Sequence, residues 1–493
     1  MSARVVAIIL HGGGPYYLEP LLAAGRVPAI AGLMAAGSSR ALRSPYPISA
    51  SAWVTMLTGQ HVASHGVIDY MQVDARSYHA ATAERVESSA YRDRTIFAVL
   101  TEAGRRMASI YLPMTNPPFP VNGMMISGFP LPDERWPPTW PPELSRGIGP
   151  LNRRKLASLR YERSDKVREY LDFHLDRVTQ VALEACRDRE YDLVLACLAL
   201  PDLAHHYFWS GDTPEALEPI YQVYERVDAA IGRLVDAAGP DDYFVLFSDH
   251  GGGPAPRRLF TVNRWLQDHG YQTPAVPALQ RLGAVNLVNG AIRAARRLRL
   301  NQRLAPLLGD GVRARLSAVT QNDAFVDWER TRAYGMNFFY PLVGVEINLR
   351  GRQRRGIVEP GTAYERLREE LAERLSGIED PASGRRVCRE VRLGAEMFAG
   401  PHVDRFPDVI GILERDYDAR TQIGDAVFEP NRLQWEYPYM GYHDSLGTFA
   451  IRGPGVSAAA TLEPVHMVDI APTLLHLLGV PQASWMEGRP FAI

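Results

Sequence analysis

The sequence predicts a layered α/β fold built on a mainly parallel β-sheet between helices. Short apolar runs occur at residues 5–10, 193–200, 243–247, 409–413 and 448–451, and such runs are typical of parallel strands buried on both faces. Amphipathic helical patterns cover residues 166–189 and 214–238, and residues 463–478 read as another helix. Strands that alternate with helices favour this fold class.

Composition narrows the class of protein. The 493 residues are 46% apolar and 22% charged, as in an ordinary globular protein with a large core. The formal net charge of −2 gives no reason to expect nucleic acid or a membrane surface as a partner. The three cysteines, Cys186, Cys197 and Cys388, form no CxxC pair. Such a small, odd and scattered set argues against a disulfide framework and against a thiolate metal site, and it is typical of proteins in a reducing compartment.

Hydropathy suggests a soluble cytoplasmic protein. Only six apolar residues separate Arg4 from His11, which is too short a run for a signal peptide or a membrane span. Elsewhere the sequence lacks an uninterrupted apolar run of about 18 residues.

Two segments interrupt the alternation of strands and helices. Residues 71–165 are rich in proline, arginine and aromatic residues, and residues 265–320 are helical in pattern and basic. We expect both segments to be insertions that cover the active site, within a single domain spanning residues 1–493.

Histidine and aspartate gather where the predicted strands end. His11 follows the first run, the second is followed by Asp202 and His206, and the third by Asp249 and His250; His443 precedes the last run. In an open parallel sheet, ligands bind at the carboxyl ends of the strands. A lone histidine at such a place is more often structural, but the conjunction predicts a metal site. Imidazole and carboxylate ligands without thiolates suit Zn²⁺, with Mn²⁺ or Fe²⁺ as alternatives.

Several blocks of the sequence resemble one known family. They are HGGGPYYLEPLLAAGRVPAIAGLMAAGSSRALRSPYPISASAWVTMLTGQHVASHGVIDY, PDLAHHYFW, LFSDHGGG, TRAYGMNFFYPLVGVEINLRGRQRRGIVEPG, GYHDSLGTFAIRGPGV and HMVDIAPTLLHLLGVP. In order and spacing they resemble the alkaline phosphatase superfamily, and within it the type I phosphodiesterase/nucleotide pyrophosphatase branch. The resemblance covers most of the chain and implies an alkaline-phosphatase-like fold with cap-like insertions.

The resemblance also implies a site with two divalent metal ions, for which Zn²⁺ is the first choice and Mn²⁺ or Fe²⁺ the alternative. Asp202, His206 and His443 would hold one ion, and Asp249 and His250 the other. The hydroxyl nucleophile would be Ser49, with Ser51 as the second choice. The implied reaction is hydrolysis of a phosphodiester or nucleotide pyrophosphate bond in a small phosphorylated substrate, through a phosphoseryl intermediate.

One position departs from the family pattern. His11 stands where the family ordinarily has an aspartate that ligates the second metal ion. Three interpretations remain open: a replacement ligand, an uncoordinated group near the phosphoryl oxygens, or a degraded second site. The departure also leaves open a non-hydrolytic member of the family.

Other polar residues and other reactions receive less weight. We expect a supporting or surface role for His205, structural hydrogen bonds for His61 and His65, and an orienting role for Asp444. Ala52 supplies no side-chain donor for the substrate's oxygens. A phosphomonoesterase, a phosphonate hydrolase or a phosphomutase could use the same site, whereas the pattern lacks the proline and arginine of a sulfatase segment.

Overall fold

The chain forms two compact units, which are described separately. The first comprises residues 1–72, 83–255 and 432–493, and the second residues 73–82 and 256–431. All the candidate site residues belong to the first unit, and a single domain over the whole chain stays a prediction. The computed structural model describes residues 4–74, 76–78, 81–131, 135–152, 164–275, 325–336, 340–421, 426–431, 441–456 and 464–491.

The first unit alternates strands and helices along most of its length. In chain order its elements are β1 Val5–Leu10, α1 Pro15–Ala23, α2 Pro28–Ala36, β2 Ser38–Arg43, α3 Ser49–Thr58, α4 Val62–His65, η1 Ser88–Ala90, η2 Arg92–Arg94, α5 Ile96–Glu102, β5 Met107–Leu112, β6 Gly123–Ser127, β7 Thr139–Trp140, α6 Leu144–Ile148, α8 Ser164–Arg187, β8 Leu193–Leu198, α9 Leu200–Phe208, α10 Pro214–Ala237, β9 Tyr243–Phe247, β10 Gly251–Gly253, β20 Tyr442–Asp444, β21 Leu446–Arg452, β22 Val465–His466, η6 Met467–Asp469 and α19 Ile470–Leu477. The short strands β3 Met71–Val73 and β4 Ala81–Arg85 lie where the chain passes between the units.

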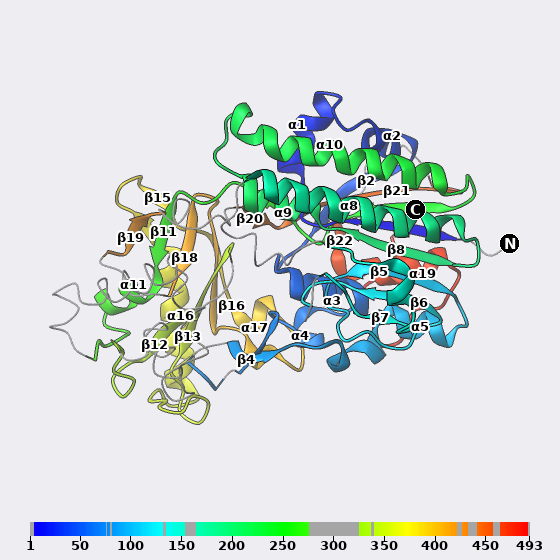
Figure 1. The fold of residues 1–493 in the computed structure, drawn as a ribbon. Helices are drawn as coiled ribbons and strands as arrows, with labels where there is room; N and C mark the ends of the chain where they lie inside the picture. Colours follow the sequence, from blue (N-terminus) through cyan, green and yellow to red (C-terminus); the bar gives the residue numbers. More distant parts are fainter. Residues whose placement is uncertain are drawn as a thin grey trace, which may run out of the picture. The chain divides into compact units, whose positions relative to one another are not determined.

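A nine-stranded sheet is the centre of the first unit. Its order is β22-β2-β21-β9-β1-β8-β5-β6-β7, and the five strands from β9 to β6 run parallel. Helices cover both faces: α1, α2, α8, α9 and α10 lie on one side and α3, α4, α5 and α19 on the other (Figure 1). Alternate residues of β1 face the first helical layer, where Val6, Ile8 and Leu10 enter one large apolar core. The predicted fold class is therefore confirmed.

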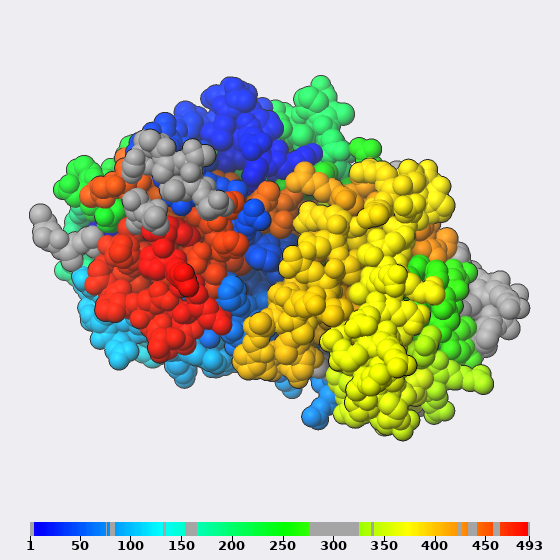
Figure 2. Space-filling view, turned by 180° about the vertical axis from the view of Figure 1, so that it is seen from behind, coloured from blue at the N-terminus to red at the C-terminus, as the bar shows by residue number. Residues whose placement is uncertain are grey.

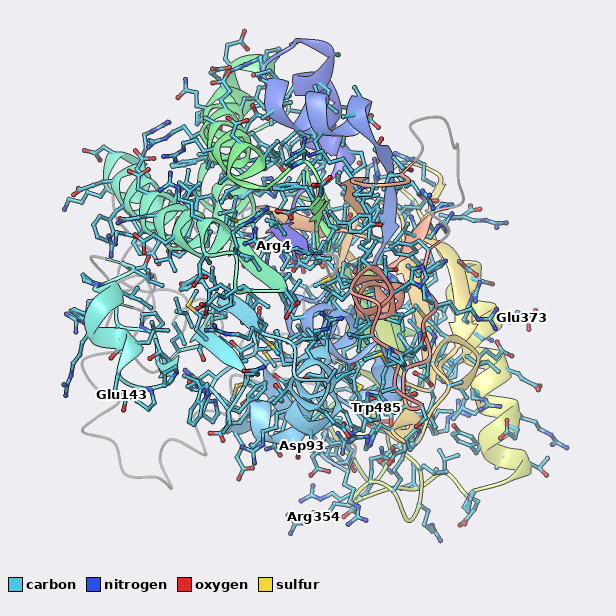
Figure 3. The ribbon with its side chains drawn as sticks, turned by 90° about the vertical axis from the view of Figure 1, so that its right-hand side faces the viewer. Arg4, Asp93, Glu143, Arg354, Glu373 and Trp485 are labelled. Carbon is cyan, nitrogen blue, oxygen red and sulfur yellow. The ribbon has the colours of Figure 1, made fainter. Side chains whose placement is uncertain are left out.

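A buried arginine joins the start of the central strand to the end of a covering helix. Arg4 lies inside the first unit, whereas Asp93 and Glu143 point outward (Figure 3). Its guanidinium donates to the carbonyls of Ala185 and Cys186 at 3.0 and 2.8 Å, in the last turn of α8, and pairs with Asp242 at 3.1 Å. A cation is favourable there because the carbonyls at a helix C-terminus carry partial negative charge.

The second unit is built mainly from antiparallel strands. Its elements are β11 Arg258–Thr261, α11 Val262–Asp268, β12 Ala333–Met336, β13 Leu342–Ile347, α16 Thr362–Ser376, β14 Glu379–Asp380, β15 Arg385–Arg386, β16 Cys388–Leu393, α17 Gly394–Met397, η5 Val403–Arg405, β17 Val409–Leu413, β18 Tyr417–Arg420 and β19 Phe428–Pro430. Strands β12, β13, β17 and β16 form an antiparallel sheet, and β18, β11 and β19 form a smaller one.

The structure corrects two strand predictions. The run at 409–413 is β17 of the second unit and the run at 448–451 belongs to β21, and both pair antiparallel to their neighbours. A strand buried on both faces shows the same apolar run in either kind of sheet, so periodicity could not separate them.

Two predicted boundaries also change. The strand predicted to end at Leu200 ends at Leu198, because Leu200 and Pro201 begin α9. The helix predicted at 463–478 begins only at Ile470, since Val465 and His466 pair with β2. Helix α19 packs against α3 and α5, and Figure 2 shows the C-terminal residues (red) at the surface of the first unit. The long helices predicted at 166–189 and 214–238 are present as α8 and α10.

The two predicted insertions have different outcomes. Residues 71–165 do not simply pass over the sheet, because they contribute β5, β6 and β7 to it. Most of the other segment, 265–320, lies outside the described residues, and its described part includes the end of α11. That either segment covers the active site stays a prediction.

The cysteines and the helices bear on two other expectations. Cys186, Cys197 and Cys388 are buried and form no disulfide. Within the described ranges, no single helix has the length and apolar composition to cross a membrane. Helices α1 and α2 have that length and composition only when they are taken together, and a 94° bend separates them.

A buried histidine makes the stability of the fold depend on pH. His174 of α8 is 1% exposed, and its ring lies 4.4 Å from that of Tyr111. Burial lowers the pKa of His174 to about 4. The unfolded chain therefore binds a proton at this histidine as the pH falls below about 6.5, whereas the folded chain binds it only near pH 4. The free energy of unfolding consequently falls as the pH falls from about 6.5 to about 4.

We predict that the His174 contribution lowers the free energy of unfolding by about 2 kcal/mol between pH 7 and pH 5. Urea unfolding of wild type and His174→Leu at both pH values measures it, because the variant lacks the titrating group. An equal loss of stability in the two proteins would contradict the assignment.

Candidate metal centre and nucleophile

Three neighbouring strands deliver most of the candidate residues to one edge of the sheet. Strands β9, β1 and β8 are adjacent and parallel, so their carboxyl ends lie together. His11 follows β1, and Asp249 and His250 follow β9. After β8, helix α9 begins at once, with Asp202 in its first turn and His206 four residues later on the same face.

The sixth candidate ligand, His443, lies on a strand that pairs with the segment after β9. Strand β20 pairs antiparallel with β10, which follows β9, and places His443 opposite Gly252. The Nδ1 of His443 lies 2.7 Å from the carbonyl oxygen of Pro47. Because a carbonyl only accepts, Nδ1 carries the proton and Nε2 is directed into the site.

Glycines allow this close approach. Gly12 has a φ of +73°, and a Cβ there would lie 2.9 Å from the Cβ of Asp202. The N–H of Gly12 donates to Oδ1 of Asp249 at 3.1 Å. A Cβ on Gly252 would lie 2.1 Å from Nδ1 of His205. The glycine runs after the strands are thus required by packing around the site.

The first ligand group consists of Asp202, His206 and His443. Oδ1 of Asp202 lies 3.3 Å from Nε2 of His206 and 3.4 Å from Nε2 of His443. The two Nε2 atoms are 3.3 Å apart. These three atoms form a nearly equilateral triangle, and each could donate a lone pair to one central ion.

The second ligand group consists of His11, Asp249 and His250, and it adjoins a hydroxyl. Oδ2 of Asp249 lies 3.3 Å from Nε2 of His11 and 3.2 Å from Nε2 of His250. Oγ of Ser49 lies 3.0 Å from Nε2 of His250 and 3.4 Å from Nε2 of His11. The rings of His250 and His443 stack at 3.8 Å, so the two groups are neighbours.

The polar atoms of both groups fit a bound cation. Oδ1 of Asp202 and Oδ2 of Asp249 are buried, and neither has a hydrogen-bond donor among the described residues. Nδ1 of His250 lies 3.0 Å from the carbonyl oxygen of Gly251, so its Nε2 presents a lone pair to Asp249. A lone pair facing a buried carboxylate is unfavourable unless a cation lies between them.

Charge states follow the same arrangement. Burial lowers the pKa of His250 to about 3, although Asp249 opposes this. Burial alone would lower the pKa of His443, but Asp202 outweighs it and the pKa is raised. Burial also opposes ionisation of Asp202, yet His206 and His11 hold its pKa well below the usual value. Near neutral pH, His250 would therefore be a neutral metal ligand and Asp202 an anionic one.

The hydroxyl of Ser49 is held at the start of a buried helix. Ser49 is the first residue of α3, and the N-cap residue Ile48 has no side chain that could accept from the first-turn N–H groups. Those groups carry partial positive charge and favour an anion. The side chain of Tyr70, which is half-buried, also hydrogen-bonds Ser49. Burial raises the pKa of Tyr70 although Ser49 opposes this, so its hydroxyl stays protonated.

The structure thus brings all the predicted site residues together: His11, Ser49, Asp202, His206, Asp249, His250 and His443. Their roles as ligands and nucleophile stay predictions. Sequence reasoning missed Tyr70 as a partner of the nucleophile. Its polar role could not be read from sequence, because 21 residues separate it from Ser49.

The less favoured residues lie elsewhere. His205 is buried, stacks on Tyr17 at 4.1 Å and contacts the hydroxyl of Tyr224 at 3.0 Å. His65 contacts the hydroxyl of Thr55 at 2.9 Å and accepts from the N–H of Val67, as expected of a structural residue.

The two remaining residues make local contacts. His61 is exposed, and its backbone N–H donates to Glu487. Asp444 accepts from the N–H of Leu446 at 3.0 Å. Neither residue belongs to a ligand group among the described residues.

Comparison with known proteins supports these findings. Residues 5–445 match the family model of type I phosphodiesterase/nucleotide pyrophosphatase. No curated protein matches the chain. Among solved structures, phosphonoacetate hydrolase from Sinorhizobium meliloti 1021 in complex with phosphonoformate is similar over 97% of this chain and 96% of that chain, with 15% identity and a TM-score of 0.56. Human ectonucleotide pyrophosphatase/phosphodiesterase 5 is similar over the same shares, with 13% identity and a TM-score of 0.49. The first similarity supports an alkaline-phosphatase-like fold.

Proposed function

The chain belongs to the type I phosphodiesterase/nucleotide pyrophosphatase family of enzymes, and on this premise we propose that it is a metal-dependent hydrolase of phosphodiester or nucleotide pyrophosphate bonds with Ser49 as nucleophile. One observation carries the proposal. Oγ of Ser49 lies 3.0 and 3.4 Å from two imidazoles of the second ligand group, at the N-terminus of α3. The substrate would be a small phosphorylated molecule.

The two ligand groups have distinct places in the proposed reaction. Asp249, His250 and His11 would hold one divalent ion beside Ser49, and Asp202, His206 and His443 would hold the other. When bound, two such ions neutralise phosphoryl charge, lower the pKa of a nearby hydroxyl and stabilise a leaving oxygen. We take His11 as a replacement ligand, because its Nε2 lies as close to Asp249 as the Nε2 of His250 does, within 0.1 Å.

The chain's own groups position the nucleophile. Helix α3 fixes Ser49 so that its oxygen faces the second ligand group, and the side chain of Tyr70 interacts with Ser49 there. The first-turn N–H groups of α3 could donate hydrogen bonds to a non-bridging phosphoryl oxygen, and so supply donors that the side chain of Ala52 cannot. Attack by Ser49 forms the phosphoseryl intermediate and expels an alcohol or nucleotide. Water then cleaves that intermediate and restores the hydroxyl.

A panel of substrates defines the bond that is cleaved. Bis-p-nitrophenyl phosphate, p-nitrophenyl phosphate and phosphonoacetate represent a diester, a monoester and a phosphonate. The proposal expects the diester to be turned over fastest in the presence of Zn²⁺ or Mn²⁺. Faster turnover of the monoester or the phosphonate would reassign the substrate class on the same site, and no turnover of any would favour a non-hydrolytic protein.

We predict that Ser49→Ala lowers turnover of the diester by at least about a thousandfold, because the covalent route is lost. Ser51→Ala is the matched control, since it removes a buried hydroxyl from the same helix and leaves Ser49 in place. Mass spectrometry of rapidly quenched protein should find the phosphoryl group on Ser49. Full turnover by Ser49→Ala would exclude the covalent mechanism.

We predict that Tyr70→Phe lowers kcat by about tenfold to a hundredfold with little change in KM, because only a hydrogen bond to the nucleophile is removed. Tyr16→Phe is the control, because the Tyr16 hydroxyl donates instead to Asp212 at 2.9 Å. An unchanged kcat in Tyr70→Phe would show that this hydroxyl has no part in positioning Ser49.

A further inference from the structure

A buried histidine outside both ligand groups lies between two tyrosines. His205 belongs to α9, directly before His206, and it is 2% exposed. Its ring stacks on the ring of Tyr17 in α1 at 4.1 Å, with 17° between the ring planes. Its Nε2 lies 3.0 Å from the hydroxyl oxygen of Tyr224 in α10. Both faces of helical contact are therefore aromatic, and the position of the ring is tightly determined.

The rest of His205 contacts the backbone of the two strands that carry the last candidate ligand. A Cβ on Gly252 would lie 2.1 Å from Nδ1 of His205, and a Cβ on Gly441 would lie 2.5 Å from its carbonyl carbon. Gly252 pairs with His443 in the ladder of β10 and β20, and Gly441 precedes His443 by two residues. Because neither glycine has a side chain, α9 meets both strands at His205.

The first ligand group depends on the distance between these same segments. Asp202 and His206 belong to α9, whereas His443 belongs to β20. Their three donor atoms nevertheless lie 3.3–3.4 Å apart. The contact between His443 and Pro47 anchors β20 to the segment before α3, and not to α9. The distance from α9 to β20 is thus set where the two pack, which is at His205.

The tyrosines give His205 a fixed support. The hydroxyl of Tyr17 donates to the carbonyl oxygen of Gly253 in β10 at 3.4 Å. The backbone of Gly14 hydrogen-bonds the side chain of Tyr224. Both tyrosines are fully buried in the large core of the first unit. A smaller side chain at position 205 would leave a space between this support and the strands, into which α9 or β10 could shift.

We propose that His205 is a positioning residue for the first ligand group: it holds α9, with Asp202 and His206, at the distance from β20 that His443 requires. The inference rests on the proposed function, because it concerns the ion that this group would hold. His205 belongs to neither ligand group among the described residues, so it acts through its neighbours.

The test measures the zinc affinity of each ligand group separately, without measuring catalysis. Zn²⁺ is titrated against a competing chelating indicator in two backgrounds. His11→Ala leaves the first group complete, and His443→Ala leaves the second group complete. His205→Ala is then added to each background. His174→Ala is the matched control, because His174 is also a buried histidine beside a tyrosine, at 4.4 Å from the ring of Tyr111, and belongs to neither group.

The expected result is a loss of affinity at one group only. His205→Ala should weaken zinc binding by about tenfold to a hundredfold in the His11→Ala background, as removal of a residue that supports a metal ligand typically does. In the His443→Ala background it should leave zinc affinity unchanged. His174→Ala should change the affinity in neither background.

A second variant keeps the test decisive if His205→Ala does not fold, which near-ultraviolet circular dichroism would show. Tyr224→Phe removes only the hydroxyl that contacts His205, and it leaves the ring in the core. It should weaken zinc binding in the His11→Ala background and not in the His443→Ala background, by less than His205→Ala does.

Two outcomes would overturn the inference. One is an equal loss of zinc affinity in both backgrounds, which would indicate a general loss of packing. The other is an unchanged affinity of the first group in the folded variants. If wild type binds two zinc ions and hydrolyses the diester in either case, only this inference fails. If wild type binds no zinc at all, the metal dependence of the proposed function fails with it.

Discussion

Two buried carboxylates, each with one oxygen that accepts no hydrogen bond from the described residues, are the constraint on which the site depends. Asp249 is fully buried and Asp202 is 7% exposed, and one oxygen of each lacks a hydrogen-bond donor among the described residues. Their nearest polar neighbours include imidazole nitrogens, one of which, on His250, presents a lone pair. Burying such an anion without a partner costs several kcal/mol. A divalent cation in each group removes this cost, and it also places positive charge beside Ser49.

The order of the strands in the sheet brings these side chains together without any special arrangement of the rest of the fold. Because β9, β1 and β8 are neighbours and parallel, side chains that are far apart in sequence meet at one edge without long loops. Gly12 lets Asp202 approach the end of β1, and Gly252 leaves room for His205. His443 reaches the site through a strand pairing and a bond to Pro47, which lies two residues before Ser49. The first ligand group and the nucleophile are thus linked through one short segment.

Sequence patterns predicted much of this arrangement, and their failures have physical causes. The runs at 5–10 and 243–247 are strands with those bounds, and the polar residues after them meet as expected. The runs at 409–413 and 448–451 are strands too, but strand direction is set by the partner and not by the run itself. Residues 71–165 were misjudged because prolines and arginines dominate that segment, and the apolar runs of β5 and β6 within it were given no weight.

Some features of the site could likewise be predicted from sequence, and others could not. Ligand types and their places at strand ends follow from local sequence and from sheet topology. The choice of Ser49 over Ser51 came from family resemblance, and contact with two imidazoles agrees with it. Tyr70 could not be predicted, since its hydrogen bond to Ser49 depends on how the chain after α4 returns to the site. The role of His11 needed the distances to Asp249 and Ser49.

The most direct measurement is anomalous diffraction at the zinc absorption edge from crystals grown with Zn²⁺. We expect two peaks, one about 2 Å from Oδ1 of Asp202 and the other about 2 Å from Oδ2 of Asp249, with Oγ of Ser49 beside the second. Absence of both peaks, or peaks only at surface residues outside these groups, would contradict the account.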